Sequence, residues 1–366
     1  MQGMLEGFEA PSTRSADVAR VLVDVDLPHM DRPLDYIVPA GLADAAVVGS
    51  LVRVRLSSAR IDGWIVERTR REVGEGTASI ESVVSSTPVL ASSIYETARR
   101  IAARFLATTS QVLSLAIPPR HARAEREVRD ENAPTWPTVT SDHAGLGWEA
   151  YPAGEALVSR LRAGESPRAI ATMLRPRLRG CLSEAVASTV ASRRSVIVVT
   201  ATGEQAGRYA RALSEDLSIP VSLAGSEVAA EDRYRLHVAA SLGRVPVVVG
   251  TRSAVWVPCS RLGLIVIVDD GDDRLRERRF PKCDALDVAV QRCAVEGSGL
   301  LVVSSARSVK AQALVRSGWA VGIEPTPHAL REATPRVHLH GSTQAEREGA
   351  GGLMRIPQAA LRMIRG

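Results

Sequence analysis

Residues 246–273 read PVVVGTRSAVWVPCSRLGLIVIVDDGDD, and their pattern decides the predicted fold. Two short apolar runs rich in β-branched residues, 247–249 and 264–268, flank a polar loop, and the second run ends at the acidic cluster 269–273. Short apolar runs bounded by turn residues are typical of strands buried in a parallel sheet. Because open α/β sheets bind ligands beyond the carboxyl ends of such strands, the acidic cluster is predicted to face a ligand crevice.

The composition is that of a globular protein long enough for two domains, with a third possible. The 366 residues are 45% hydrophobic and 24% charged. No apolar run reaches the roughly 18 residues of a membrane-spanning helix, and the N-terminus has no signal-peptide core, so we expect a cytoplasmic location. The cysteines form no C-x-x-C pair, which disfavours a zinc ribbon or a disulfide framework and leaves buried thiols. They are Cys181, Cys259, Cys283 and Cys293.

The basic residues are almost all arginines, which limits where a lysine-dependent phosphate-binding loop can occur. The net charge of +5 permits nucleic-acid binding without establishing it. Of the 46 basic residues only Lys282 and Lys310 are lysines. A phosphate-binding loop of the G-x-x-x-x-G-K-[ST] type needs a lysine and glycine amides to neutralise the β- and γ-phosphates. Neither lysine follows glycine or precedes Ser or Thr, so the sequence predicts no such loop.

The first part of the chain has the pattern of a small barrel. Residues 1–18 are predicted to be a disordered tail, and short alternating segments with polar turns follow between 19 and 117. Strands are predicted at 21–27, 34–38, 50–56, 61–68 and 79–84, and helices at 92–107 and 110–117. Residues 118–147 are charged and Pro-rich, which favours a linker, or a solvated helix followed by a linker.

Residues 148–323 alternate between helix and strand, which predicts a parallel sheet covered on both faces. Helices are predicted at 153–162, 166–174 and 182–192, ahead of the first strand. Strands are then predicted at 196–200, 221–223, 245–250, 264–268 and 300–304, and helices at 204–217, 229–242, 284–295 and from 308. Residues 324–366 are predicted to be irregular, apart from a weakly amphipathic segment at 356–364.

Two regions of the chain resemble one known family. G-T-R-S-A at 250–254, followed by L-G-L-I-V-I-V-D-D at 262–270, is similar to primosomal protein N′, the replication restart protein PriA, in which GTRSA precedes a strand ending in D-E-E-H. L-P-x-x-x-x-P-L-D-Y-x-V-P at 27–39 and V-x-V-R-L at 52–56 are similar to the 3′-end DNA-binding domain of that family. The resemblance implies an α/β protein in which a small β-barrel-like DNA-binding domain, 19–117, precedes a single RecA-like parallel helicase lobe, 148–323.

The resemblance implies a pocket that recognises the free 3′-hydroxyl of a nascent strand. Its residues here are Leu34, Asp35, Tyr36 and, in the next loop, Ser57. A carboxylate can accept a hydrogen bond from a 3′-OH and repel an extra phosphate, and an aromatic ring can pack on a sugar or base. The family's phenylalanine before Asp is Leu34 here, its loop glycine is Ser57, and its lysine near the last strand is replaced around Glu81.

Two further interpretations concern the same domain. Three arginines on the wet face of the barrel are predicted to meet backbone phosphates. They are Arg53, Arg55 and Arg60. The residues themselves also allow a plainer interpretation, in which Asp35 is a turn acceptor and Tyr36 a half-buried aromatic of an ordinary strand.

The helicase motifs are degenerate. They are represented by Thr251, Arg252, Asp269, Asp270 and Asp272. The D-E-E-H box reads D-D-G-D at 269–272, and S-S-A-R-S at 304–308 stands where the family has G-S-A-T-P. The family's zinc module and second motor lobe are not expected. ATP hydrolysis in such motors needs two lobes that clamp the nucleotide. We therefore expect no catalytic residue, no metal site and no ATP, Mg²⁺ or zinc cofactor, and a solvated turn at the acidic cluster.

The leading interpretation is a DNA-binding replication-restart protein that recognises 3′ ends at stalled or branched forks in primosome assembly, without ATPase or helicase activity. The resemblance implies as partners forked DNA with a 3′ end, primosome and helicase-loading proteins and single-stranded DNA-binding protein, and no membrane. Two alternatives stay open. One is an ATP-dependent 3′–5′ DNA helicase, and the other is a truncated or decayed family member with only a protein-interaction role.

Overall fold

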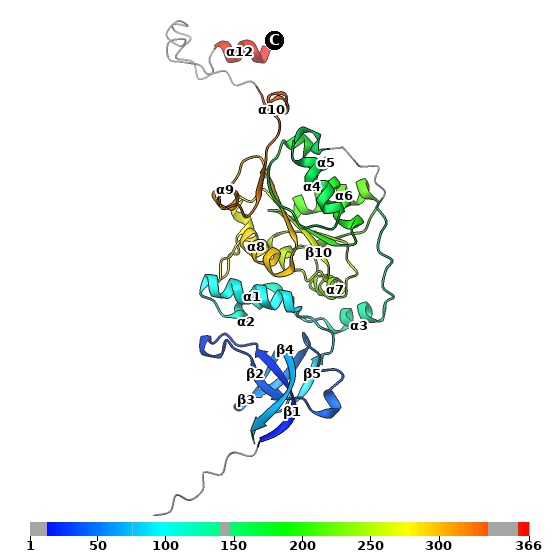
Figure 1. The fold of residues 1–366 in the computed structure, drawn as a ribbon, viewed down its shortest axis with the longest axis vertical. Coiled ribbons are helices and arrows are strands. Elements are labelled where there is room, and N and C mark those ends of the chain that lie inside the picture. The colour runs from blue at the N-terminus through cyan, green and yellow to red at the C-terminus, as the bar shows by residue number, and fades with distance from the viewer. Residues whose placement is uncertain (1–12, 75, 140–146, 336–357, 366) are drawn as a thin grey trace, which may run out of the picture. The chain divides into compact units, whose positions relative to one another are not determined.

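The computed structural model describes residues 13–74, 76–139, 147–335 and 358–365 (Figure 1). The chain divides into two units, Met1–Pro325 and Thr326–Gly366. The first unit contains a five-stranded antiparallel sheet and a seven-stranded parallel sheet, so both predicted structured regions lie in it. Short 3-10 helices complete the connections at η1 (Pro28–Met30), η2 (Ala40–Leu42), η4 (Trp148–Ala150), η5 (Arg175–Arg177), η6 (Arg252–Trp256) and η7 (Asp273–Leu275).

The five-stranded sheet closes into the predicted small barrel. Its strands are β1 (Thr13–Val23), β2 (Leu34–Ile37), β3 (Leu51–Leu56), β4 (Ala59–Gly74) and β5 (Ser82–Ser85), in the order β2-β1-β4-β3-β5. The segment before β5 hydrogen-bonds to β2 and to β3. Ile37 N–H donates to Ala78 O at 2.8 Å, and Glu81 N–H donates to Arg53 O at 2.9 Å. The segment before β5 thereby links the β2 edge to β3, beside the other edge, as closure requires.

Two predictions for the N-terminal strand were wrong. The disordered tail was predicted to reach residue 18, but β1 begins at Thr13, which pairs with Gly74 at the far end of β4. This partner is remote in sequence, so local composition does not reveal it. The strand also ends at Val23 instead of residue 27, and the Asp24 carboxylate that follows accepts a hydrogen bond from Ser110 Oγ at 2.6 Å. Residues 1–12 of the predicted tail lie outside the described residues.

Helices α1 (Ser92–Phe105) and α2 (Thr109–Ala116) lie between the barrel and the parallel sheet (Figure 1). The stripe of Ile94, Ala98 and Ile101 on α1 is buried, as its helical spacing predicts. Helix α2 begins at a capping box in which Thr108 Oγ1 accepts from Gln111 N–H at 3.2 Å.

The predicted linker contains a helix, α3 (Ala122–Asp130), as the second of the two alternatives expects, but this helix buries Ala124, Glu125 and Val128 and is not fully solvated. Its Glu125 is 4% exposed and accepts hydrogen bonds from Ser85 Oγ at 2.7 Å, Arg120 Nε at 2.8 Å and Tyr234 Oη at 3.0 Å. The partners come from β5, from the residues before α3 and from the lobe. Helix α3 can therefore bury one face despite its charged sequence, because the buried Glu125 carboxylate is hydrogen-bonded.

The parallel sheet has the order β12-β6-β11-β10-β7-β9-β8, with β10 (Leu262–Val268) at its centre and all seven residues of β10 buried. Its other strands are β6 (Arg168–Thr172), β7 (Ser195–Val199), β8 (Val221–Ala224), β9 (Val247–Gly250), β11 (Gly299–Ser304) and β12 (Val321–Ile323). The helices are α4 (Gly154–Arg162), α5 (Leu178–Ala191), α6 (Gly203–Leu217), α7 (Ala230–Ser241), α8 (Ala285–Glu296) and α9 (Val309–Arg316). Right-handed crossovers place α5 and α6 on one face and α7, α8 and α9 on the other (Figure 1). The RecA-like parallel α/β lobe is confirmed.

The prediction of a helix at 166–174 was wrong, because these residues contain strand β6. Ala169, Ile170 and Ala171 are buried between β11 and β12, and all three strands are parallel. Alanine favours a helix locally, but the pairing with two remote strands overrides that preference.

The second unit contains α10 (Pro327–Ala333) and α12 (Gln358–Arg365). Helix α10 lies in residues predicted to be irregular, so that prediction was wrong there, and α12 overlaps the segment 356–364 predicted to be amphipathic. In the ranges that the structure describes, no helix has the length and hydropathy needed to cross a membrane.

Candidate nucleic-acid interface

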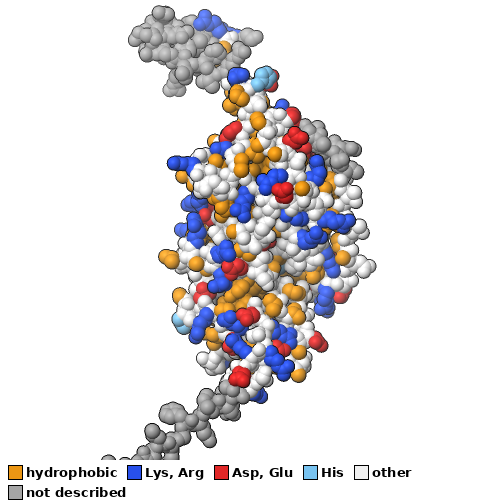
Figure 2. Space-filling view, viewed as in Figure 1, with side chains coloured by type: hydrophobic (Ala, Val, Ile, Leu, Met, Phe, Trp, Pro, Cys, Tyr) orange, Lys and Arg blue, Asp and Glu red, His pale blue; other side chains and the backbone are white. Residues whose placement is uncertain are grey.

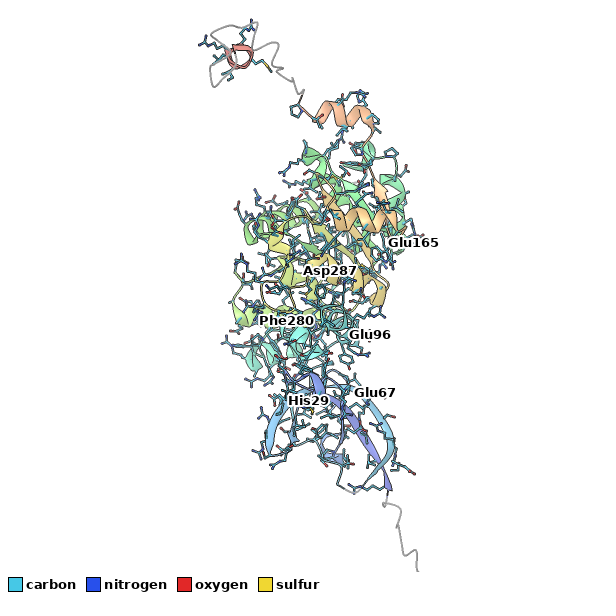
Figure 3. All side chains as sticks on the ribbon, turned by 90° about the vertical axis from the view of Figure 1, so that its left-hand side faces the viewer. His29, Glu67, Glu96, Glu165, Phe280 and Asp287 are labelled. Atoms are coloured by element: carbon cyan, nitrogen blue, oxygen red, sulfur yellow. The ribbon has the colours of Figure 1, made fainter. Side chains whose placement is uncertain are left out.

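Asp35 lies on the outer face of β2, opposite Arg20 of β1. Its carboxylate forms ion pairs with Arg71 of β4 and, at 3.8 Å, with Arg20 Nε. Arg20 also donates from Nη1 to Glu67 Oε2 at 3.0 Å; Glu67 is labelled on the barrel in Figure 3. The Asp35 side chain is 42% exposed, so a ligand can reach it, but two guanidinium groups already stand beside it.

The sequence prediction missed Arg20 and Arg71. Arg20 comes just before the strand predicted at 21–27, and Arg71 lies beyond the predicted strand 61–68, whereas β4 continues to Gly74. If the predicted strand 61–68 had been extended to Gly74, its alternating pattern would have placed Arg71 on the same face of the sheet as Arg20.

Leu34 and Tyr36 point to the opposite side, into the barrel. Leu34 packs against the core, and Tyr36 is only 3% exposed. Tyr36 Oη donates to Arg55 O at 3.2 Å, and burial raises the pKa of this phenol. The ring therefore has no free face on which a base can stack, and its observed role is to join β2 to β3. This agrees with the plainer interpretation of Tyr36 as an aromatic of an ordinary strand, except that the side chain is buried and not half-buried.

Ser57 lies in the turn between β3 and β4, two residues after Arg55, and is exposed. Its φ of +54° is in the left-handed region, which glycine adopts without steric cost. The hydrogen bond between Tyr36 and Arg55 brings this turn toward β2.

The three arginines predicted to meet phosphates are exposed but paired. Arg53 Nε lies 2.7 Å from Asp62, and Arg55 Nε and Arg60 Nε lie 3.1 Å and 2.9 Å from Glu81. Figure 2 likewise shows Lys and Arg side chains spread over the face in view, with acidic side chains among them. Exposed ion pairs contribute about 1 kcal/mol or less, so a phosphate can compete for these arginines.

In the lobe, Thr251 and Arg252 follow β9 and lie beside the end of β8. A Cβ on Gly250 would lie 1.9 Å from Ala224 O, so only glycine lets the two loops approach. Thr251 N–H donates to Ala224 O at 3.1 Å. Arg252 begins η6, and its Nε donates to Glu277 Oε2 at 3.2 Å.

Of the three aspartates after β10, Asp270 and Asp272 have separate side-chain partners. Asp269 has a φ of +54°, and Asp272 pairs with Arg274 at 2.6 Å, which lowers the pKa of Asp272. Asp270 accepts hydrogen bonds from Ser304 and Ser308, yet burial raises the pKa of its carboxyl. Asp270 therefore holds the loop that leads into α9. Across the described ranges, no three His, Cys, Asp or Glu side chains form a group that could hold a metal ion.

The loop between β6 and α5 has the strand–loop–helix arrangement of a phosphate cradle, but its residues do not fit a triphosphate. Met173 N–H donates to Ser304 O at 2.8 Å, and Leu174 N–H donates to Tyr151 Oη at 2.8 Å. Pro176 has no amide hydrogen to donate. The adjacent cavity of about 90 Å³ is lined by Met173, Arg175 and Asp269. The sequence analysis did not predict this loop, because residues 166–174 were predicted to form a helix.

Residues 20–118 match the PriA family model described as 3′DNA-binding domain (3′BD). Over 348 residues the chain is 36% identical to "Probable replication restart protein PriA" of Mycobacterium tuberculosis strain H37Rv, a match of 93% of this chain and 52% of that protein. The protein of the same name in Mycobacterium leprae is 32% identical, at 93% and 53%. The chain spans about half the length of the curated relatives it matches.

Among solved structures, RecG bound to a three-way DNA junction is 14% identical at a TM-score of 0.36, covering 87% of this chain and 52% of RecG. A DEAD box protein from Methanococcus jannaschii is 14% identical at a TM-score of 0.33, covering 48% of this chain and 49% of that one.

The fold and the matched domain define a protein in which a barrel of the 3′ DNA-binding type precedes one parallel α/β lobe. The chain belongs to the replication restart protein PriA family.

Proposed function

We propose that this protein binds DNA 3′ ends at stalled or branched replication forks during replication restart, without hydrolysing ATP. The observation that carries the proposal is the closed barrel that matches the 3′ DNA-binding model over 20–118 and presents Asp35 on its surface. Family membership supports the DNA substrate, and Asp35 supplies the chemistry for the strand end.

Asp35 would recognise the strand end by accepting a hydrogen bond from the 3′-hydroxyl. Arg20 and Arg71 form ion pairs with the carboxylate and hold it in place. They also stand where they can meet the last internucleotide phosphate of the strand. A 3′-phosphate adds charge beside the Asp35 carboxylate and replaces the donor that Asp35 needs, so it would weaken binding.

The lobe would act as a scaffold. The amides of Met173 and Leu174 are committed to protein acceptors, and no lysine is available to the loop. Both observations support the proposal that the loop after β6 does not cradle ATP with Mg²⁺. Primosome and helicase-loading proteins, and single-stranded DNA-binding protein, are the partners that the family suggests for this scaffold.

Fork binding tests the proposal. Anisotropy is measured on forks that differ only in a 3′-hydroxyl or 3′-phosphate on the nascent strand, at several salt concentrations because phosphate contacts are salt-dependent. We expect the parent to prefer the hydroxyl by about tenfold. Asp35→Asn should lose this preference, whereas Asp44→Asn, the same change at another exposed aspartate of the barrel domain, should keep it. Equal affinity of the parent for both forks, or DNA-dependent ATP hydrolysis, would overturn the proposal.

A further inference from the structure

The base of a 3′-terminal nucleotide finds no exposed aromatic ring on strand β2. The 3′-hydroxyl proposed to bind Asp35 and the terminal base belong to one sugar, so a residue that contacts the base has to lie close to Asp35. Leu34 packs in the barrel core, and Tyr36 is 3% exposed. Aromatic rings are the side chains on which unpaired bases stack. A ring that contacts the terminal base therefore has to come from another element.

The outer face of strand β1 leads from Asp35 toward helix α1. Val21 lies in the barrel core, so its neighbours Arg20 and Leu22 point outward. Arg20 forms an ion pair with Asp35, and its side chain is 37% exposed. Leu22, on the same face of β1, is 2% exposed. The cover over the outer face of the barrel therefore ends between Arg20 and Leu22.

Tyr95 of helix α1 belongs to that cover. It packs against the buried cluster that contains Leu22 and the apolar stripe of α1, and it is itself half-buried. Burial raises the pKa of Tyr95, and the positive charges of Arg99 and Arg20 oppose this rise. Arg20 therefore lies within electrostatic range of the Tyr95 phenol, as well as beside Asp35.

The barrel and helix α1 contribute to this region from the same side of the molecule. In Figure 3, Glu96, the residue after Tyr95 on α1, is labelled just above Glu67 of the barrel. The Glu67 carboxylate accepts a hydrogen bond from Arg20 at 3.0 Å. The ring of α1 and the ion pairs around Asp35 therefore border one stretch of surface.

The Tyr95 ring is available to a ligand. Across the described residues its hydroxyl forms no hydrogen bond. Arg99 Cζ lies 5.9 Å from the ring centroid, and Arg99 Nη1 donates to Glu96 Oε2 at 3.1 Å. A cation over an exposed ring is held more weakly than a stacked base, so Arg99 does not block the ring. Phe105, at the other end of α1, is roughly 15 Å from Tyr95 along the helix axis and is too far away to contact the same base.

We propose that Tyr95 is a DNA-contact residue on which the base of the 3′-terminal nucleotide packs while Asp35 holds the 3′-hydroxyl. The proposal rests on the function proposed for Asp35 and adds the base as a second determinant of affinity. Because every base has a π-face, the contact tolerates any base and detects only whether one is present. A strand end that has lost its base therefore binds less tightly than an intact one.

Forks that end in an abasic site test this contact. Two forks are identical except that the last, unpaired nucleotide of the nascent strand carries thymine or no base, and anisotropy is measured over a salt series. We expect the parent to bind the base-bearing end about tenfold more tightly. Tyr95→Leu keeps an apolar side chain in the packing but removes the ring, so it should bind both ends equally. Tyr95→Phe should keep the preference, and so should Phe105→Leu, the same loss of a ring at the other end of α1.

The comparison separates a DNA contact from a structural role. If Tyr95 only supports the fold, Tyr95→Leu weakens binding of both ends by the same factor, and this outcome overturns the proposal. Equal affinity of the parent for both ends also overturns it. The hydroxyl preference, measured on the same proteins, reports Asp35 separately: if it persists while the base makes no difference, only the Tyr95 contact is refuted. Absence of the hydroxyl preference in the parent refutes the function proposed for Asp35, and this proposal with it.

Discussion

Replacing Glu125 by alanine should destabilise the first unit strongly, because this one carboxylate joins the barrel, α3 and the lobe. It accepts from Ser85 Oγ at 2.7 Å, from Arg120 Nε at 2.8 Å and from Tyr234 Oη at 3.0 Å. Each hydrogen bond to a charged group contributes about 1.5–3 kcal/mol, but these do not sum, since burying the carboxylate opposes them. Breaking a buried pair by removing one partner costs about 3–5 kcal/mol, and we expect a loss in that range.

The pH dependence gives a second, independent measurement. Burial alone would raise the pKa of Glu125, but the hydrogen bonds from Arg120, Ser85 and Tyr234 outweigh it, and the pKa lies below its ordinary 4.5. The charge therefore stabilises the folded state above pH 4.5, and this contribution is lost as the pH falls through the lower folded-state pKa. Glu125→Gln should cost about 1–3 kcal/mol at pH 7, and its difference from the parent should shrink in acid.

Urea unfolding followed by tryptophan fluorescence measures both effects, with the slope of the transition compared between variants. Glu131→Ala, which removes an exposed glutamate at the end of α3, is the matched control and should stay within about 0.5 kcal/mol of the parent. The role assigned to Glu125 is refuted if Glu125→Ala has the same free energy of unfolding as the control. It is also refuted if the difference in free energy between Glu125→Gln and the parent is the same at neutral and acid pH.

Two further outcomes are expected. Gly250→Ala should destabilise the lobe by about 1–3 kcal/mol or more, since its Cβ would lie 1.9 Å from Ala224 O. Gly207→Ala, where nothing lies within 4 Å inside helix α6, should stabilise it by about 0.5–1 kcal/mol, and thermal melts of the two variants should shift in opposite directions. Asp270→Asn should raise stability at pH 7, because the raised pKa of Asp270 means that its charged form is disfavoured in the folded state. Urea midpoints of Asp270→Asn and the parent should converge below the ordinary Asp pKa of 3.8, and a difference that persisted there would contradict this assignment.

The sequence by itself determined the parts of this protein that depend on local pattern. A short β-branched run bounded by turn residues is typical of a core strand, so β10 and the parallel sheet around it were predictable. The small barrel was predictable from period-two alternation, and the family from the motifs at 27–39 and 250–270. The lack of a lysine in any phosphate-binding motif is likewise a property of the sequence alone.

Only the tertiary structure decided which residues meet across long separations. The alanine-containing segment of β6 forms a strand because it pairs with remote strands. Glu125 of the charged helix α3 and Tyr36 of β2 are both buried. The tertiary structure also pairs Arg20 and Arg71 with Asp35, although these residues come from three strands. The physical reason is that periodicity reports which side of an element is buried, whereas the identity of the partner depends on chain segments that no local window contains.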